Sequence, residues 1–299
     1  LNLQSIDDLI SKVIPSHVRD SNPLDKDGFK IPEGIPENQF LSEFTSLMDK
    51  NKNYKCYIGN GFSKSITPAV IKRNVLENPN WYTPYTPYQA EIGQGRLESL
   101  INFQTLVSEL TGMQIANASL LDEGTACAES MVMCHNIHED PNKSKFFISA
   151  NTFPHIKEVV KTKAKFLGID VVEGNQNEYD FSSAKDIFGV LIQNPDNTGN
   201  VGDLTSLITS LKSQGIVVSV CADILANAIF KSPGEMGADI VCGTTQRLGI
   251  PIGYGGPHAG YIATKDEHKR KLPGRLIGVS KDTHGNLAYR MSLQTREQH

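Results

Sequence analysis

The chain has 299 residues, of which 39% are hydrophobic and 21% are charged, a composition typical of a globular protein. Its formal net charge of −4 and the lack of a basic stripe argue against a nucleic-acid partner. No apolar run approaches the roughly 20 residues that a membrane span requires, so we expect no membrane partner either. The five cysteines form no CxxC pair and no zinc spacing, which predicts a reducing compartment and no metal site.

The first part of the chain is polar and interrupted by prolines, with short helical runs at Ile6–Val13 and Phe40–Met48. This pattern predicts an N-terminal arm, placed at residues 1–60, that lies over another part of the molecule. The chain opens at Leu1 without a methionine or a basic leader. We interpret it as a trimmed or processed product, which cannot itself report a targeting signal.

Helices and strands alternate in the following domain, placed at residues 61–299. Helical spacing of apolar residues predicts helices that end at Gly112, Gly168 and Gly215, the second of them opened by Pro154. Short apolar runs predict strands at 145–150, 170–173, 188–193, 217–222, 239–245 and 260–263. Together they predict an α/β fold, a mostly parallel sheet with helices on both faces.

Two strand ends resemble the cofactor site of a pyridoxal-phosphate enzyme. Asp223 follows the strand Val217–Ala222, and Gln246 follows the strand Asp239–Thr245. In such enzymes a strand-end carboxylate keeps the pyridine nitrogen protonated, and a lysine after a later strand forms the Schiff base. An amide cannot form a Schiff base, so Gln246 predicts a site without activity of its own. Asp223 is then a relict of the cofactor site or a structural strand-end residue.

Two further loops could face this site. Gly124 and Thr125 open a helix whose N–H groups could hold a phosphate, although the acidic residues just before Gly124 predict a weakened cup. Gly255, Gly256 and His258 follow the strand-end glutamine, where glycines let backbone N–H groups approach a phosphate. A simple tight turn is the alternative for this second loop.

His155 and the aromatic segment at residues 81–94, WYTPYTPYQAEIGQ, are further candidates. His155 is either the remnant of a residue that stacked on the cofactor or a surface residue near a helix start. In the aromatic segment, Tyr85, Tyr88 and Glu91 could form an aromatic interface patch.

Four long stretches together resemble one family, the P-protein of the glycine cleavage system, or glycine dehydrogenase (decarboxylating). They are NVLENPNWYTPYTPYQAEIGQGRLESLINFQ, NASLLDEGTACAESM, PGEMGADIVCGTTQRLGIPIGYGGPHAGY and GRLIGVSKDTHGNLAYRMSLQTREQH. The resemblance is to the N-terminal half of the long single-chain form. The segment IGNGFSKS at residues 58–65 departs from the family pattern, so no role is assigned there.

The resemblance implies a large domain of the pyridoxal-phosphate-dependent transferase fold (fold type I), truncated at its C-terminal side. It also implies a degenerate N-terminal half that packs against a C-terminal half carrying the lysine and pyridoxal phosphate. Aligning Ile250-Pro251 with the active half places Gln246 at the lysine position. Tyr85, Tyr88 and Glu91 would then line the partner half's active site.

The implied reaction is decarboxylation of glycine on pyridoxal phosphate, with transfer of the aminomethyl group to the lipoyl arm of the H-protein. The full chain would be a homodimer, in the mitochondrial matrix if the source is a eukaryote and otherwise in the cytoplasm. This chain alone would be inactive. The alternative is a non-catalytic pseudoenzyme half needed only for assembly, whereas an independent aminotransferase is disfavoured by Gln246. We further expect the segment Arg290–His299 to begin a helix.

Overall fold

The computed structural model describes residues 2–19, 32–253 and 258–293, and its contacts divide the chain into two units between Tyr57 and Ile58. The first unit contains the helices α1 (Ile6–Val13) and α2 (Glu37–Met48), close to the predicted helical runs. Neither helix buries a residue, so the described part of this unit has no hydrophobic core of its own.

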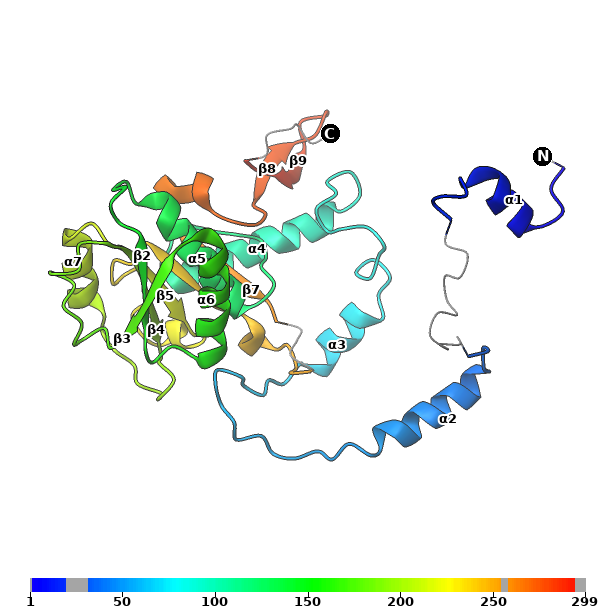
Figure 1. The fold of residues 1–299 in the computed structure, drawn as a ribbon, viewed down its shortest axis with the longest axis horizontal. Helices are drawn as coiled ribbons and strands as arrows, with labels where there is room; N and C mark the ends of the chain where they lie inside the picture. The colour runs from blue at the N-terminus through cyan, green and yellow to red at the C-terminus, as the bar shows by residue number, and fades with distance from the viewer. Residues whose placement is uncertain (1, 20–31, 254–257, 294–299) are drawn as a thin grey trace. The chain divides into compact units, whose positions relative to one another are not determined.

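The second unit contains five α-helices within its described residues (Figure 1). They are α3 (Ala69–Leu76), α4 (Gln94–Thr111), α5 (Glu123–Ile137), α6 (Pro154–Leu167) and α7 (Thr205–Ser213). Gly112 and Gly168 cap α4 and α6 in the left-handed conformation, with φ of 68° and 69°, which glycine adopts without a steric penalty. The predicted ends of these two helices are therefore confirmed.

A seven-stranded sheet forms the centre of this unit, in the order β1-β7-β6-β5-β4-β2-β3. Strands β2 to β6 run parallel, while β7 is antiparallel to both β6 and β1. The strands are β1 (Ile115–Ala116), β2 (Lys145–Ser149), β3 (Asp170–Gly174), β4 (Ile187–Asn194), β5 (Val217–Ala222), β6 (Ile240–Thr244) and β7 (Gly260–Thr264). The mostly parallel sheet predicted from the sequence is confirmed.

Helices cover both faces of the sheet. Along β5, Val218 and Val220 join the core cluster that includes residues of α4 and α7. Val217 and Cys221, which point to the other face, join the cluster that includes residues of α5 and α6. This period of two is the alternation of a strand that is buried on both sides.

A separate hairpin follows the sheet, made of β8 (Ile277–Lys281) and β9 (Leu287–Met291). The prediction of a helix from Arg290 is wrong at its start, because Arg290 and Met291 belong to β9; residues 294–299 lie outside the described residues. The Gln94 side chain on α4 pairs with both backbone groups of Tyr289, at 2.8 Å each, and so holds β9 extended. No helix within the described residues is long and apolar enough to cross a membrane.

Candidate functional site: a degenerate cofactor cleft

The predicted strand-end residues converge on one cleft. A cavity of about 300 Å³ lies beyond the C-terminal ends of β4, β5 and β6, where ligands bind in sheets of this kind. The residues that line it are Gly61, Ser63, Glu123, Phe153, Gln193, Pro195, Asp196, Gly199, Cys221, Ala222, Asp223, Thr244 and Arg247.

Gln246 is only 1% exposed and is held by backbone groups rather than pointing at a ligand. Its Nε2 donates to the carbonyl of Ser63 at 3.0 Å and to the carbonyl of Ile250 at 2.6 Å. Its Oε1 is buried and has no hydrogen-bond partner within the described residues. The amide thus ties its own loop to the segment around Ser63.

That segment, residues 61–67, is called the strap below. Besides the bond from Gln246 to Ser63, the Ser65 hydroxyl donates to the Ile250 carbonyl and the Thr67 hydroxyl donates to the Gly249 carbonyl. Gly61 allows the strap to approach closely, because a Cβ there would lie 2.5 Å from the Phe153 ring. The segment that departs from the family pattern therefore lies over the cleft.

The strap places an aromatic ring against His155. The Phe62 ring lies 5.0 Å from the His155 ring, centroid to centroid, with an interplanar angle of 34°. His258 approaches the Phe62 ring edge-on at 5.4 Å, and Phe153 stacks on His155 at 5.9 Å. Burial lowers the pKa of His155, which favours the neutral ring in this aromatic stack. His155 thus has a protein side chain as its stacking partner.

Asp223 forms an ion pair with the residue that follows Gln246. The Arg247 guanidinium lies 2.5 Å from Asp223 Oδ2, and the backbone N–H of Leu225 donates to Oδ1 at 2.9 Å. Both oxygens of the carboxylate are therefore engaged. A pyridine nitrogen would have to compete with an arginine for this carboxylate, which the sequence analysis did not anticipate.

The start of α5 is closed to a phosphate. Asp122 caps the helix with its own carboxylate, which accepts a hydrogen bond from Thr125 N at 2.7 Å. A Cβ on Gly124 would lie 3.1 Å from Val159 of α6, so this glycine serves helix packing. The acidic pair before Gly124 thus occupies the place where an anion would sit.

Glu123 projects from the same turn into the cleft, with its side chain 13% exposed. Burial raises its pKa from 4.5 to about 7, an effect partly offset by the hydrogen bond that Cys221 donates at 3.5 Å. His155 Nε2 lies 4.0 Å from the carboxylate. In neither protonation state does this carboxyl group place a positive charge in the cleft for a phosphate.

These residues do not fit pyridoxal phosphate. Gln246 is a bonded amide that cannot form a Schiff base, the turn that opens α5 holds two carboxyl groups, the strand-end carboxylate is paired with Arg247, and Phe62 lies against His155. Gly255 and Gly256 lie outside the described residues. His258, which is described, contacts Phe62 rather than presenting a free side chain to the cleft.

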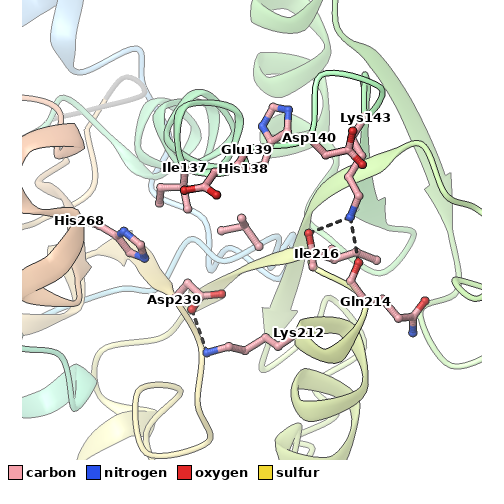
Figure 2. Close-up of a pocket in the computed structure, with 12 residues that line it drawn as sticks. Ile137, His138, Glu139, Asp140, Lys143, Lys212, Gln214, Ile216, Asp239 and His268 are labelled. Atoms are coloured by element: carbon pink, nitrogen blue, oxygen red, sulfur yellow. Dashed lines mark hydrogen bonds and ion pairs between the residues drawn. The ribbon is translucent and has the colours of Figure 1, made fainter.

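A second cavity, of about 480 Å³, lies at the opposite edge of the sheet, beside the N-terminal ends of β5 and β6. Figure 2 shows that both lysines of this cavity have partners: Lys143 donates to the carbonyls of Gln214 and Gly215, and Lys212 pairs with Asp239 at 2.9 Å. These bonds tie the two lysines to the edge of the sheet.

The aromatic segment is held in three different ways. Tyr88 bonds the Ser119 hydroxyl at 2.5 Å and packs on a small core beneath α4. Tyr85 is 39% exposed and carries the Arg96 guanidinium 5.6 Å above its ring. Glu91 is exposed. None of the three residues lines this chain's own cleft, and their place in the wall of a partner half's site stays a prediction. Tyr85 lines a separate cavity with Arg96.

The fold defines a class: an α/β domain of the pyridoxal-phosphate-dependent fold, here with a cleft whose residues do not fit the cofactor. The family model of the glycine cleavage system P-protein matches residues 1–299, so the chain belongs to that family and corresponds to a region within its N-terminal half. The chain is 51% identical to the glycine dehydrogenase (decarboxylating) of Christiangramia forsetii and 49% identical to that of Nostoc sp.. All of this chain is covered, but only 31% and 30% of those relatives.

A solved structure supports the same assignment. The chain superposes on an inhibitor-bound crystal structure of glycine decarboxylase (P-protein) with a TM-score of 0.86 and 30% sequence identity. The match covers 99% of this chain and 66% of that one. The pyridoxal-phosphate-dependent fold predicted from the sequence is confirmed.

Proposed function

We propose that this chain is the lysine-less part of a glycine decarboxylase and acts only together with the part that carries the lysine and pyridoxal phosphate. Family membership supports the reaction, and the share of its relatives' length that the chain spans leaves room for that second part. The observation that carries the proposal is the buried, backbone-bonded Gln246 at the lysine position.

In the assembled enzyme, pyridoxal phosphate would supply the electron sink for loss of the glycine carboxylate. The aminomethyl group would pass to the lipoyl arm of the H-protein. Tyr85, Tyr88 and Glu91 would contribute to the wall of the partner half's site, and the full chain would form a homodimer. Residence in the mitochondrial matrix of a eukaryote, or in a bacterial cytoplasm, is part of the same proposal.

The alternative is an assembly half without any catalytic contribution. The hydrogen bond between the Tyr88 and Ser119 hydroxyls and the packing of the Tyr88 ring favour this reading for Tyr88. Glu91 is exposed and is not anchored in this way. A substitution of Glu91 therefore distinguishes a catalytic half from a half needed only for assembly.

The deciding experiment combines this chain with the C-terminal part of a P-protein and follows release of carbon dioxide from glycine with lipoylated H-protein. The variants are Tyr88→Phe and Glu91→Gln, with Glu98→Gln as an exposed control on α4. A catalytic wall predicts a loss of kcat of about tenfold or more for Glu91→Gln with assembly intact. Loss of assembly without a change in the activity of the assembled fraction would instead establish the scaffold.

A further inference from the structure

A separate cavity of about 460 Å³ lies at the start of α4, away from the degenerate cleft. Its volume falls in the range of small-molecule sites. The residues that line it are Asn78, Asn80, Trp81, Thr83, Tyr85, Ile92, Gly93, Gly95 and Arg96. Aromatic and aliphatic groups thus form one part of the wall, while two amides and a guanidinium form another.

Arg96 is half-buried in this wall and fixed in orientation. Its Nη1 donates to the Thr83 hydroxyl at 2.7 Å and lies 3.5 Å from the Tyr85 carbonyl, and its guanidinium carbon lies 5.6 Å from the centre of the Tyr85 ring. None of the carboxylates that the structure describes forms an ion pair with Arg96. Neutral partners hold the guanidinium in place while its charge stays uncompensated.

The remaining guanidinium nitrogens, Nε and Nη2, donate to no acceptor among the described residues. The planar fork of a guanidinium matches a carboxylate, to which it can donate two parallel hydrogen bonds. The first turn of α4 adds to the favourable field, since its N-cap, Gly93, provides no side-chain hydrogen bond. These features favour an anionic group with two coplanar oxygens.

The apolar wall indicates what accompanies that anion. Trp81 is 42% exposed and Ile92 is 57% exposed, values that leave apolar surface beside the guanidinium available for contact. A bare acetate would leave this surface wet, whereas a carboxylate with an apolar body would cover it. The cavity therefore fits an organic carboxylate larger than acetate.

We propose that this cavity binds a small organic carboxylate, with Arg96 holding the carboxylate group and Trp81 and Tyr85 contacting the apolar body. The inference goes beyond the proposed function and does not depend on it, because it concerns binding to this chain alone. A failure of the decarboxylation experiment would leave the binding experiment valid, and the reverse also holds.

Trp81 is the only tryptophan in the sequence, so tryptophan emission reports on this cavity. The probe is cyclohexanecarboxylate, titrated at constant ionic strength, with cyclohexanecarboxamide as its neutral counterpart and acetate and glycine as smaller carboxyl compounds. We expect a saturable change in emission, with a Kd at least about tenfold weaker for the carboxamide, because the amide loses the charge-assisted bonds. Acetate and glycine should bind more weakly than the probe.

Variants test the role of Arg96. Arg96→Gln should weaken binding of the probe at least about tenfold, and Arg96→Lys should recover part of it, since lysine keeps the charge but not the fork. Arg275→Gln removes an equal charge at an exposed position and should bind as the original chain does. Circular dichroism verifies that each variant is folded.

Equal affinity for the carboxylate and the carboxamide on the unaltered chain would overturn the proposal, as would unchanged binding by Arg96→Gln. The first comparison needs no variant, so the proposal stays falsifiable even if Arg96→Gln does not fold. A linear, non-saturating response to the probe would also contradict a defined site.

Discussion

At the scale of single residues, we expect the stability of the fold to depend more on the glycine at position 61, in the strap, than on the glycine at position 59. Gly59 and Gly61 both have positive φ, 71° and 82°, but only Gly61 faces a crowded ring. Gly61→Ala should therefore destabilise the fold by about 2–4 kcal/mol, through backbone strain plus displacement of Phe153. Gly59→Ala, with open space around its Cβ, should cost only about 1–2 kcal/mol. Urea denaturation measures both, and equal losses would show that the contact with Phe153 contributes nothing.

Glu123 makes stability depend on pH in the direction opposite to a salt-bridged carboxylate. Its pKa is raised to about 7, so the folded protein favours the neutral acid. The contribution of the neutral Glu123 side chain to the free energy of unfolding is complete below about pH 4.5 and is lost as the pH rises through about 7. Glu123→Gln, neutral at every pH, should become more stable than the original chain above pH 7, by up to about 3 kcal/mol.

Denaturation at about pH 5 and pH 8 measures this difference for Glu123→Gln, with the exposed Glu98→Gln as control. Comparison with the unaltered chain at each pH cancels other titrations in this range, such as that of His268, whose pKa is lowered by burial. A stability difference that does not change between the two pH values would contradict the raised pKa.

The sequence predicted Gln246 and Asp223 as neighbours because parallel strands end at one edge of a sheet. It did not predict Phe62 or the pairing of Arg247 with Asp223. The contact of Phe62 with His155 joins residues 93 positions apart (155 − 62) and has no local pattern. Arg247 directly follows Gln246 in the sequence, and this adjacency was the only pattern from which the pairing with Asp223 could have been predicted.

At the scale of elements, the hairpin β8–β9 packs on α4 through glutamine side chains. Their amide groups pair with backbone N–H and C=O groups of the hairpin, as a neighbouring strand would. Gln104 accepts from Ile277 N at 2.8 Å and donates to Ile277 O at 3.1 Å. Gln104→Leu should leave both backbone groups of this buried residue unpaired, at a cost of about 2–3 kcal/mol. In the Gln104→Leu variant, hydrogen exchange at the backbone amides of β8 should be faster than in the original chain.

The control for Gln104→Leu is Ser99→Leu, at an exposed position on the same helix. This variant introduces the same side chain without removing a bond to the hairpin, so exchange in β8 should stay slow. Equal acceleration in both variants would mean that α4 itself is disturbed and that the glutamine contact is not the anchor.

Helix ends were predictable because glycine and proline act locally: Gly112 and Gly168 stop α4 and α6 where the sequence indicated. The hairpin was not predictable in this way, since its strands depend on contacts with α4. The charged run near Arg290 has no strand pattern of its own. Tertiary bonds from Gln94 and Gln104 therefore decide the conformation of this region.

At the scale of the whole molecule, several groups at once keep the cleft from fitting pyridoxal phosphate. Gln246, Phe62, the Asp223–Arg247 pair and the carboxyl groups of the α5 turn each oppose a different part of pyridoxal phosphate: the aldehyde, the ring, the pyridine nitrogen and the phosphate. A domain with such a cleft retains the fold that brings strand ends together without retaining the chemistry. Its relatives, in which the matched region is about a third of the length, combine it with further sequence.

Because several groups oppose the cofactor, we predict that a lysine at position 246 alone does not restore binding of pyridoxal phosphate. Pyridoxal phosphate is added to the chain and to Gln246→Lys, followed by borohydride and peptide mapping. We expect no stoichiometric lysine adduct on the original chain. Gln246→Lys should also fail to show a saturable, stoichiometric adduct at residue 246, because the ring, nitrogen and phosphate positions stay blocked. A stoichiometric adduct at that lysine would mean that Gln246 alone disables the cleft, and an adduct at another lysine of the original chain would contradict the assignment as a lysine-less half.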